Sequence, residues 1–303
     1  MQGLVFWLVY PLLWLISILP FRLFYILSDF VFIVIYHLVG YRKKTVVKNL
    51  KLCFPDKSEK DRKQIERKFY RHMCDMFLET IKTLNISKKE LKRRFTFNTD
   101  DIEKINNLDK STLLMCGHYA SYEWMVSMEL YGLKPKSYGV YKRIRNTKLD
   151  KLIRGIREKF NTELIESHQA VRTIIRNQQQ QQLSIYGMIA DQSPKLHKAN
   201  FWTDFMGVTI PFFTASEKMA TQFDMAVVYL EVKKVKRGFY EARLKPISIE
   251  PRNEAEFNIT KKYVSFLEQQ IQEQPEFYLW THKRWKHKNA KVPKHAVISH
   301  RNS

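Results

Sequence analysis

A histidine follows a glycine at the end of a short apolar run, and a carboxylate comes five positions later. The stretch reads LLMCGHYASYEW over residues 113–124, and its two candidate residues are His118 and Glu123. A carboxylate that accepts a hydrogen bond from one ring nitrogen fixes the tautomer of a histidine, and the other nitrogen is then left as a base. Such a pair could take a proton from a hydroxyl group that belongs to a substrate.

The surrounding residues indicate how the pair would be positioned. Ser111–Cys116 is apolar and stops at Gly117, which predicts a buried strand, and Tyr119–Tyr131 is predicted to be a helix. Open α/β sheets place their sites at the carboxyl ends of strands, where His118 would lie. Residues five apart in an unbroken helix are separated by about 140° around its axis. A turn must therefore lie between His118 and Glu123 if they are to meet.

The rest of the chain alternates helices with strands. In the predicted helices apolar residues recur at steps of three and four, and in the predicted strands they form short continuous runs. The predicted helices are Lys57–Leu84, Leu149–Phe160, His168–Arg176 and Ile259–Gln272, and the predicted strands are Lys136–Tyr141, Leu183–Ala190, Ala226–Val232 and Tyr240–Leu244. This order predicts an α/β fold, with a mixed, largely parallel sheet flanked by helices.

The N-terminus is long and apolar. Met1–Phe21 carries no charge, and Leu23–Tyr41 is interrupted only by Asp29 and His37. About 20 apolar residues can span a bilayer, so we expect a membrane-anchoring helix or helical hairpin over residues 1–41. A buried hairpin of the core is the alternative, and the second stretch could either span the membrane or lie in its interface. We expect a globular domain over residues 42–290 and a loosely ordered basic tail over 291–303.

The composition narrows the chemistry. The 303 residues carry a formal net charge of +22, which favours an anionic partner such as an acidic lipid or an acidic protein. Three widely spaced cysteines without a CxxC pattern favour reduced thiols over a disulfide framework or a zinc site. GxSxG, HExxH and any recognisable nucleic-acid module are missing from the sequence. We therefore expect no metal, no cofactor and no nucleic acid, and direct transfer to a bound alcohol rather than a covalent enzyme intermediate.

Other side chains could contact a substrate. Lys142, Arg143, Asn146 and Arg157 form a basic and amide-bearing group that could hold phosphates or a phosphopantetheine arm. Asp191 directly follows a predicted strand and could orient an acceptor or a basic side chain, or it could cap a turn. Trp124 could line an acyl channel or pack in the core.

Six segments together resemble one family, the lauroyl/myristoyl acyltransferases that complete lipid A in Gram-negative bacteria. GHYASYEW is also similar to the HX4D/E motif of glycerolipid acyltransferases. The segments follow the family's order and are YRKKTVVKNLKLCFPDKS (41–58), GHYASYEW (117–124), VYKRIRNTKLDKLI (140–153), IADQSPK (189–195), FMGVTIPFFTASEKMA (205–220) and PEFYLWTHKRWK (275–286). Lys142 stands where the family usually has arginine.

The resemblance implies an activity, partners and a location. His118 and Glu123 would be the catalytic dyad in a glycerolipid acyltransferase-like fold. The protein would move a fatty acyl chain from acyl carrier protein to a hydroxyl of a lipid A precursor. It would work as a monomer at the cytoplasmic face of the inner membrane.

Two other functions are compatible with the sequence. The first is O-acylation of another lysolipid, either amino-acid-based or glycerol-based, which the motifs do not separate from a lipid A precursor. The second belongs to another class, a non-catalytic basic protein that binds the membrane surface.

Replacing Glu123 by alanine is expected to abolish acyl transfer while the protein stays folded and membrane-bound. An acyl-transfer assay on the purified variant, with circular dichroism as the control for folding, measures this. Retained turnover would contradict a role of Glu123 in the dyad.

Overall fold

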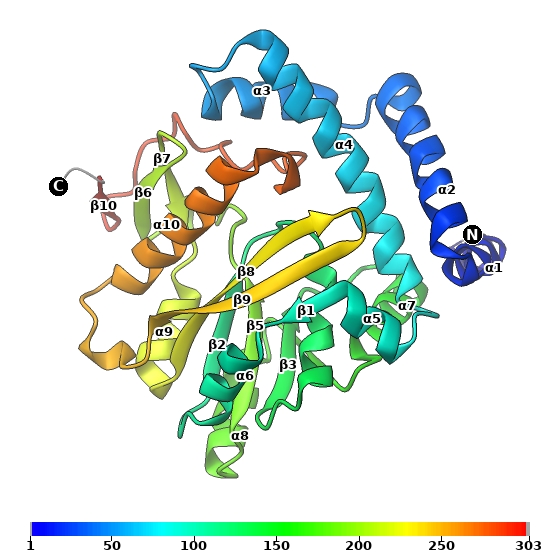
Figure 1. Cartoon of the computed structure of the whole chain (residues 1–303). Coiled ribbons are helices and arrows are strands. Elements are labelled where there is room, and N and C mark those ends of the chain that lie inside the picture. The colour runs from blue at the N-terminus through cyan, green and yellow to red at the C-terminus, as the bar shows by residue number, and fades with distance from the viewer. Residues whose placement is uncertain (1, 301–303) are drawn as a thin grey trace.

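A seven-stranded sheet forms the centre of the structure, which is a computed structural model that describes residues 2–300. The strand order is β1-β9-β8-β2-β5-β3-β4, and only the β8–β9 pair is antiparallel (Figure 1). The strands are β1 (Phe95–Phe97), β2 (Thr112–Cys116), β3 (Lys136–Tyr141), β4 (Glu163–Glu166), β5 (Ser184–Ile189), β8 (Ala226–Lys236) and β9 (Phe239–Ser248). The predicted mixed, largely parallel sheet is confirmed.

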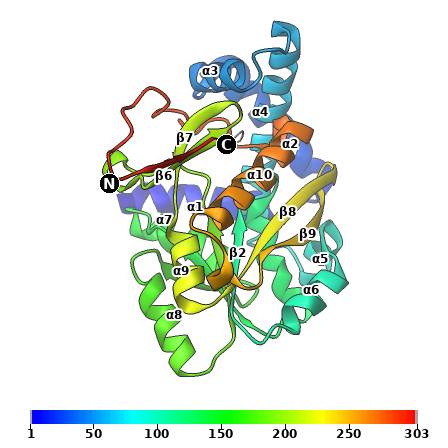
Figure 2. The ribbon, with the colours of Figure 1, turned by 90° about the vertical axis from the view of Figure 1, so that its left-hand side faces the viewer.

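Helices flank this sheet, and those predicted from periodicity lie close to their expected bounds. They are α3 (Lys43–Cys53), α4 (Glu59–Lys82), α5 (Lys88–Arg94), α6 (Thr99–Asn106), α7 (Thr147–Glu158), α8 (Ala170–Gln179), α9 (Ala215–Phe223) and α10 (Asn258–Glu273). Ser58 caps α4 by accepting a hydrogen bond from the backbone N–H of Asp61, which is why this helix begins after Pro55. Helix α10 packs across β8 and β9 (Figures 1 and 2).

The register of two neighbouring parallel strands determines where polar side chains can meet. Cys116, the last residue of β2, pairs with Ile189, the last residue of β5. Both strands are buried between layers, and their carboxyl ends lie at the same edge of the sheet. His118 and Asp191 each follow their strand by two residues, so the sheet brings them to the same place.

The predicted helix over Tyr119–Tyr131 differs in the structure. Ala120 adopts a left-handed conformation with φ of 50°, and a 3₁₀ helix, η2 (Tyr122–Tyr131), follows. A left-handed residue cannot continue a right-handed helix, so the chain turns between His118 and the helix. The turn expected between His118 and Glu123 is thus present.

A second, three-stranded sheet was not predicted. It has the order β10-β6-β7 and consists of β6 (Phe201–Phe205), β7 (Val208–Phe212) and β10 (Val297–Ser299). Pro211 in β7 weakens the strand signal, but β7 is an edge strand and tolerates proline there. Within the tail 291–303, for which we expected loose order, Val297–Ser299 pair in parallel with β6.

The N-terminal apolar segment forms two helices that pack on the domain. They are α1 (Gln2–Ile18) and α2 (Phe21–Ile33), which continues as the π-helix η1 (Val34–Val39). Pro11 lies inside α1 without ending it, whereas Pro20 precedes α2. Among the described residues, one helix, Phe21–Val39, is long and apolar enough to cross a membrane. Figure 1 shows α2 alongside α4, a contact made through buried Phe24 and Phe32.

Gly117 connects β2 to the site because a side chain has no room there. A Cβ atom built on Gly117 would lie 2.6 Å from Cδ1 of Leu267, a fully buried residue of α10. Helix α10 therefore packs directly on the backbone that precedes His118. A glycine at this position permits the close approach of the two elements.

Gly117→Ala is expected to destabilise the fold by about 1–3 kcal/mol, since Leu267 must move within a close-packed core. Gly155 is a matched control, because it is exposed in α7 and a Cβ there meets nothing within 4 Å. Gly155→Ala should stabilise by about 0.5–1 kcal/mol, because alanine loses less backbone entropy in a helix. Chemical denaturation measures both, and a Gly117→Ala variant as stable as Gly155→Ala would refute the packing argument.

Candidate active site

Asp191 binds His118 through two contacts at the carboxyl edge of the sheet. Its Oδ1 atom lies 2.6 Å from Nδ1 of the ring, and its Oδ2 atom accepts a hydrogen bond of 3.1 Å from the His118 backbone N–H. An ionised carboxylate only accepts, so Nδ1 carries the proton and Nε2 is the basic nitrogen. The side-chain amide nitrogen of Gln192 lies 3.4 Å from Nε2.

This arrangement corrects the sequence-based pairing. We expected Glu123 to accept from a ring nitrogen of His118, but Asp191 occupies that position. Glu123 instead accepts two hydrogen bonds from Arg157, of 2.8 Å from Nε and 2.5 Å from Nη2. The ring of Tyr122 packs edge-on against the imidazole, and the left-handed Ala120 lies between the two residues in the chain. Asp191 was expected either to orient a side chain or to cap a turn, and it orients His118.

The charged groups around His118 raise the pKa of its ring. Burial alone would lower the pKa of His118, but the charge of Asp191 and its hydrogen bond, followed by the charge of Glu123, outweigh burial and raise it above the usual 6.5. Burial would likewise raise the pKa of Asp191, yet His118 and then the guanidinium of Arg284 lower it. The pair is therefore a charged carboxylate beside an imidazole that is more basic than normal.

Arg157 and Glu123 form a second pair beside the first. The Arg157 side chain is 26% exposed and that of Glu123 is 11% exposed, so the guanidinium is partly accessible from solvent. Burial lowers the pKa of Arg157, but the hydrogen bonds and charge of Glu123 outweigh it and raise the pKa above its usual value. Arg157 is thus held as a cation near the histidine, and its expected role in binding phosphate stays a prediction.

Three other predicted residues lie in the segment that leads into α7. Lys142 and Arg143 are exposed on the segment before α7, and Nη1 of Arg143 lies 3.9 Å from Glu166. Asn146 caps α7, since its side-chain oxygen accepts from the backbone N–H groups of Lys148 and Leu149. The structure gives Asn146 this capping contact, and the expected contacts of Lys142 and Arg143 with phosphate stay predictions.

Trp124 lies in the core, where it does not reach the surface. It is fully buried, and its Nε1 atom donates to the carbonyl oxygen of Glu79 at 3.1 Å and to Oγ1 of Thr83 at 3.0 Å. Of the two alternatives stated for this residue, core packing is the one observed. The indole connects η2 to α4 and so fixes the helix that carries Glu123.

The segment 275–286 near the C-terminus supports the histidine. The backbone N–H of Leu279 donates to the carbonyl oxygen of His118 at 3.0 Å, and that of Ala120 donates to the carbonyl oxygen of Phe277 at 2.9 Å. Ser193, two residues after Asp191, donates to the carbonyl oxygen of Arg284 at 2.7 Å. One segment therefore holds the loops that follow both β2 and β5.

Two residues of this segment also contribute charge or polarity to the site. Arg284 is fully buried and donates to the carbonyl oxygen of Pro211 at 2.9 Å. Burial is the main cause that lowers the pKa of His282 to about 4, although Asp191 opposes it. His282 is therefore neutral near pH 7, and its buried Nδ1 has no hydrogen-bond partner among the residues described.

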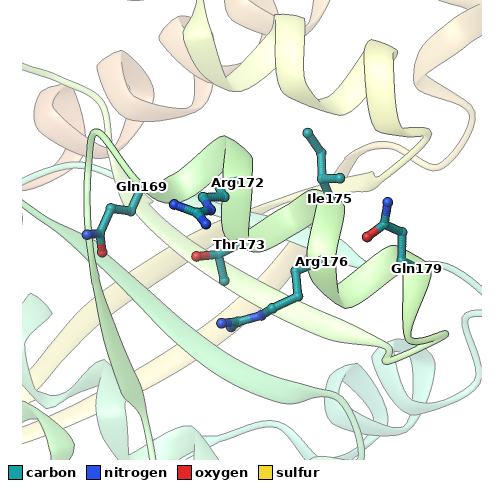
Figure 3. A pocket seen from close by; sticks show the side chains of 6 residues that line it. All are labelled: Gln169, Arg172, Thr173, Ile175, Arg176 and Gln179. Carbon is teal, nitrogen blue, oxygen red and sulfur yellow. The ribbon is translucent and has the colours of Figure 1, made fainter.

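His118 does not line any of three hollows formed by the described residues. A hollow of about 570 Å³ lies along α8 and is lined by Gln169, Arg172, Thr173, Ile175, Arg176 and Gln179. Figure 3 shows Ile175 and Arg176 pointing in opposite directions from this helix. A narrow apolar space of about 30 Å³ lies beneath η2 and is bordered by Met125 and Gly187.

Sequence reasoning missed the partner of His118, although a signal was present. Two buried apolar strands, each followed within two residues by a titratable side chain, are expected to present those side chains together if the strands are neighbours. The order of strands in the sheet is the missing information. Among residues 2–300, no group of three His, Cys, Asp or Glu side chains could hold a metal ion.

The fold and the site define an α/β protein with a carboxylate-oriented histidine at the edge of its sheet. The model of the bacterial lipid A biosynthesis acyltransferase family matches residues 1–287, and the chain belongs to this family. It is similar to the lipid A biosynthesis lauroyltransferase of Escherichia coli strain K12, with 23% identity over 292 residues that cover 95% of this chain and 93% of the relative. The chain is therefore an acyltransferase of lipid A biosynthesis.

The protonation of His118 predicts a pH dependence. A base must be neutral, so activity should fall as the pH is lowered through the raised pKa of His118, with a midpoint above 6.5. Asp191→Asn removes the charge that raises this pKa. The midpoint should then move to lower pH, and the maximal rate should fall by about 10²–10⁴-fold because the tautomer is no longer fixed.

The pH–rate profiles of the wild-type protein and of Asp191→Asn measure both effects. Glu231→Gln is a control, because Glu231 pairs with Lys245 on the β8–β9 hairpin. An unchanged midpoint in Asp191→Asn, with only a lower rate, would show that Asp191 does not set the basicity of His118.

Proposed function

We propose that the protein transfers a fatty acyl chain from acyl carrier protein to a hydroxyl group of a lipid A precursor. The observation that carries this proposal is the contact of Asp191 with Nδ1 of His118, which leaves Nε2 as a base. The His118 side chain is 16% exposed, so a substrate hydroxyl can reach it. The family and the similar lauroyltransferase support the transfer of an acyl group and a role in lipid A biosynthesis.

In the proposed reaction His118 acts as a general base. The acceptor hydroxyl attacks the carbonyl carbon of the thioester while Nε2 takes the hydroxyl proton. The tetrahedral intermediate then collapses, the C–S bond breaks, and the imidazolium returns the proton to the leaving thiolate. An ester and the free thiol of the carrier are the products, and His118 returns to its neutral form.

The negative charge on the carbonyl oxygen requires a donor. The backbone N–H groups of His118, Tyr119 and Ala120 already donate, at 3.1, 2.8 and 2.9 Å, to Asp191, Gly117 and Phe277 respectively. A basic side chain is therefore favoured over these backbone groups. We propose that Arg157 fills this role, with Glu123 positioning its guanidinium.

The positive charge and the apolar N-terminus support the proposed location and partners. A net charge of +22 suits both anionic headgroups and an acidic carrier protein. The apolar helix Phe21–Val39 supports attachment to a membrane. We propose that the protein acts as a monomer at the cytoplasmic face of the inner membrane, where carrier protein and lipid precursor are both accessible.

An acyl-transfer assay tests the function directly. The purified full chain in detergent is incubated with acyl carrier protein bearing a labelled acyl chain and with one of three acceptors. These are a lipid A precursor, a glycerol-based lysolipid and an amino-acid-based lysolipid, and mass spectrometry detects the ester. We expect transfer to the lipid A precursor. Transfer only to another acceptor would refute the lipid A precursor as the acceptor. No transfer to any acceptor would favour a non-catalytic, membrane-binding role.

His118→Ala is expected to lower this transfer by about 10²–10⁴-fold, the contribution of a general base. His168→Ala is the matched control, because the His168 side chain is 70% exposed and belongs to a different loop. Equal activities of the two variants would exclude His118 as the base. Thermal unfolding of both variants separates this outcome from misfolding.

A further inference from the structure

Helix α2 presents two different faces. Leu23, Ile26, Phe30 and Ile33 are 54, 65, 62 and 51% exposed and follow one another at steps of three, four and three residues. Such spacing places them on one side of a helix. We call these four residues the α2 apolar face. Ser28, which follows Phe24 by four residues and precedes Phe32 by four, is fully buried with both on the other side.

The buried side of α2 is attached to the domain by polar contacts. Ser28 donates to Oδ1 of Asp75 on α4 at 2.7 Å, and Tyr25 donates to Oε1 of Glu79 at 2.9 Å. Arg237, at the turn between β8 and β9, donates to Asp29 at 2.9 and 3.0 Å. It also donates to Asp75 at 2.7 Å. Three separate elements of the chain therefore meet in one network of hydrogen bonds.

This network is incompatible with a helix that crosses a bilayer. Asp29 lies near the middle of the apolar helix Phe21–Val39, so a spanning orientation would carry it to the hydrocarbon centre. Arg237 would follow Asp29, or the contact between them would break. Glu79 and Asp75, which are 0% and 1% exposed, would lose the hydrogen bonds that α2 donates to them. Both alternatives are costly, whereas an α2 that stays docked on α4 keeps every contact.

The docked helix still needs a partner for its exposed side. The α2 apolar face suits a partner with an apolar interior. The net charge of +22 suits a partner whose outer layer is anionic. Arg42, Lys44 and Lys48 are exposed and follow the helix directly in sequence. An anionic lipid bilayer provides both features, which neither a soluble acidic protein nor a second copy of this basic chain would do.

We infer that α2 lies in the plane of an anionic bilayer, with the α2 apolar face at the boundary between headgroups and acyl chains. This inference rests on the proposed membrane location and specifies its geometry. Asp29 then points toward the domain, and the turn at Arg237 is held next to the membrane surface. The helix is a fixed part of the domain that lies on the bilayer without crossing it.

Depth measurements on the vesicle-bound full chain test the orientation. Single cysteines replace Leu23, Ile26, Phe30 and Ile33 one at a time and carry a nitroxide label, while the native Cys53, Cys74 and Cys116 are all buried. The vesicles contain phosphatidylethanolamine and phosphatidylglycerol. We expect one common shallow depth, about 5–10 Å below the headgroups.

Two results would contradict the in-plane orientation of α2. Leu23 and Ile33 are ten residues apart, so a spanning helix would separate their depths by about 15 Å, and such a gradient would overturn the inference. Labels that remain in water on bound vesicles would also overturn it. Neither result depends on turnover, so a failed orientation and a failed acyltransferase function are distinguishable.

A pair of charge variants gives a second readout. Phe30→Glu should weaken vesicle binding by about tenfold or more, because it places a carboxylate in the interface. Ile249→Glu is the matched control, since Ile249 is 48% exposed on a loop after β9 and should leave binding unchanged. Both variants should unfold at the wild-type temperature. Equal weakening in the two variants, or no weakening in Phe30→Glu, would contradict the assigned face.

Discussion

The site depends on one contact, that between Asp191 and His118. A carboxylate that binds both the ring and the backbone N–H of the same residue fixes the side chain and its loop together. It can do so because β2 and β5 are parallel neighbours whose last residues are in register. The basicity of Nε2, the tautomer and the direction of the ring all follow from this single pairing. Glu123 contributes through its charge and through Arg157.

The segments that resemble the family in sequence are for the most part supports of this contact. Asn49, in the segment 41–58, donates to the carbonyl oxygens of Trp280 and His282 at 2.9 Å each. Phe205, in the segment 205–220, stacks on Trp285 with ring centroids 5.7 Å apart. Four distant segments thus converge on residues 275–286, which in turn hold the loop of His118. Their residue types are explained by packing and hydrogen bonding as much as by contact with a substrate.

Periodicity in the sequence predicted the helices and strands better than it predicted which side chains contact one another. The strand Lys136–Tyr141 has the predicted bounds, and α4 begins two residues after the predicted start, because alternation and helical periodicity are local properties. The helix after His118 was predicted too early, since nothing local reveals the left-handed Ala120. The partner of His118 was assigned by proximity in sequence to Glu123. The order of strands, which depends on contacts across the whole chain, gives that partner to Asp191 instead.

The hydrogen bonds that join the histidine loop to Leu279, which donates, and to Phe277, whose carbonyl oxygen accepts, have a consequence for synthesis of the protein. About 160 residues must leave the ribosome after His118 before its loop can be clamped, since domains fold as their segments emerge. A nascent chain that already carries the histidine, Glu123 and Arg157 still lacks the clamp. The histidine loop is therefore held in place only after residues 275–286 have been synthesised, long after α1 and α2 have emerged.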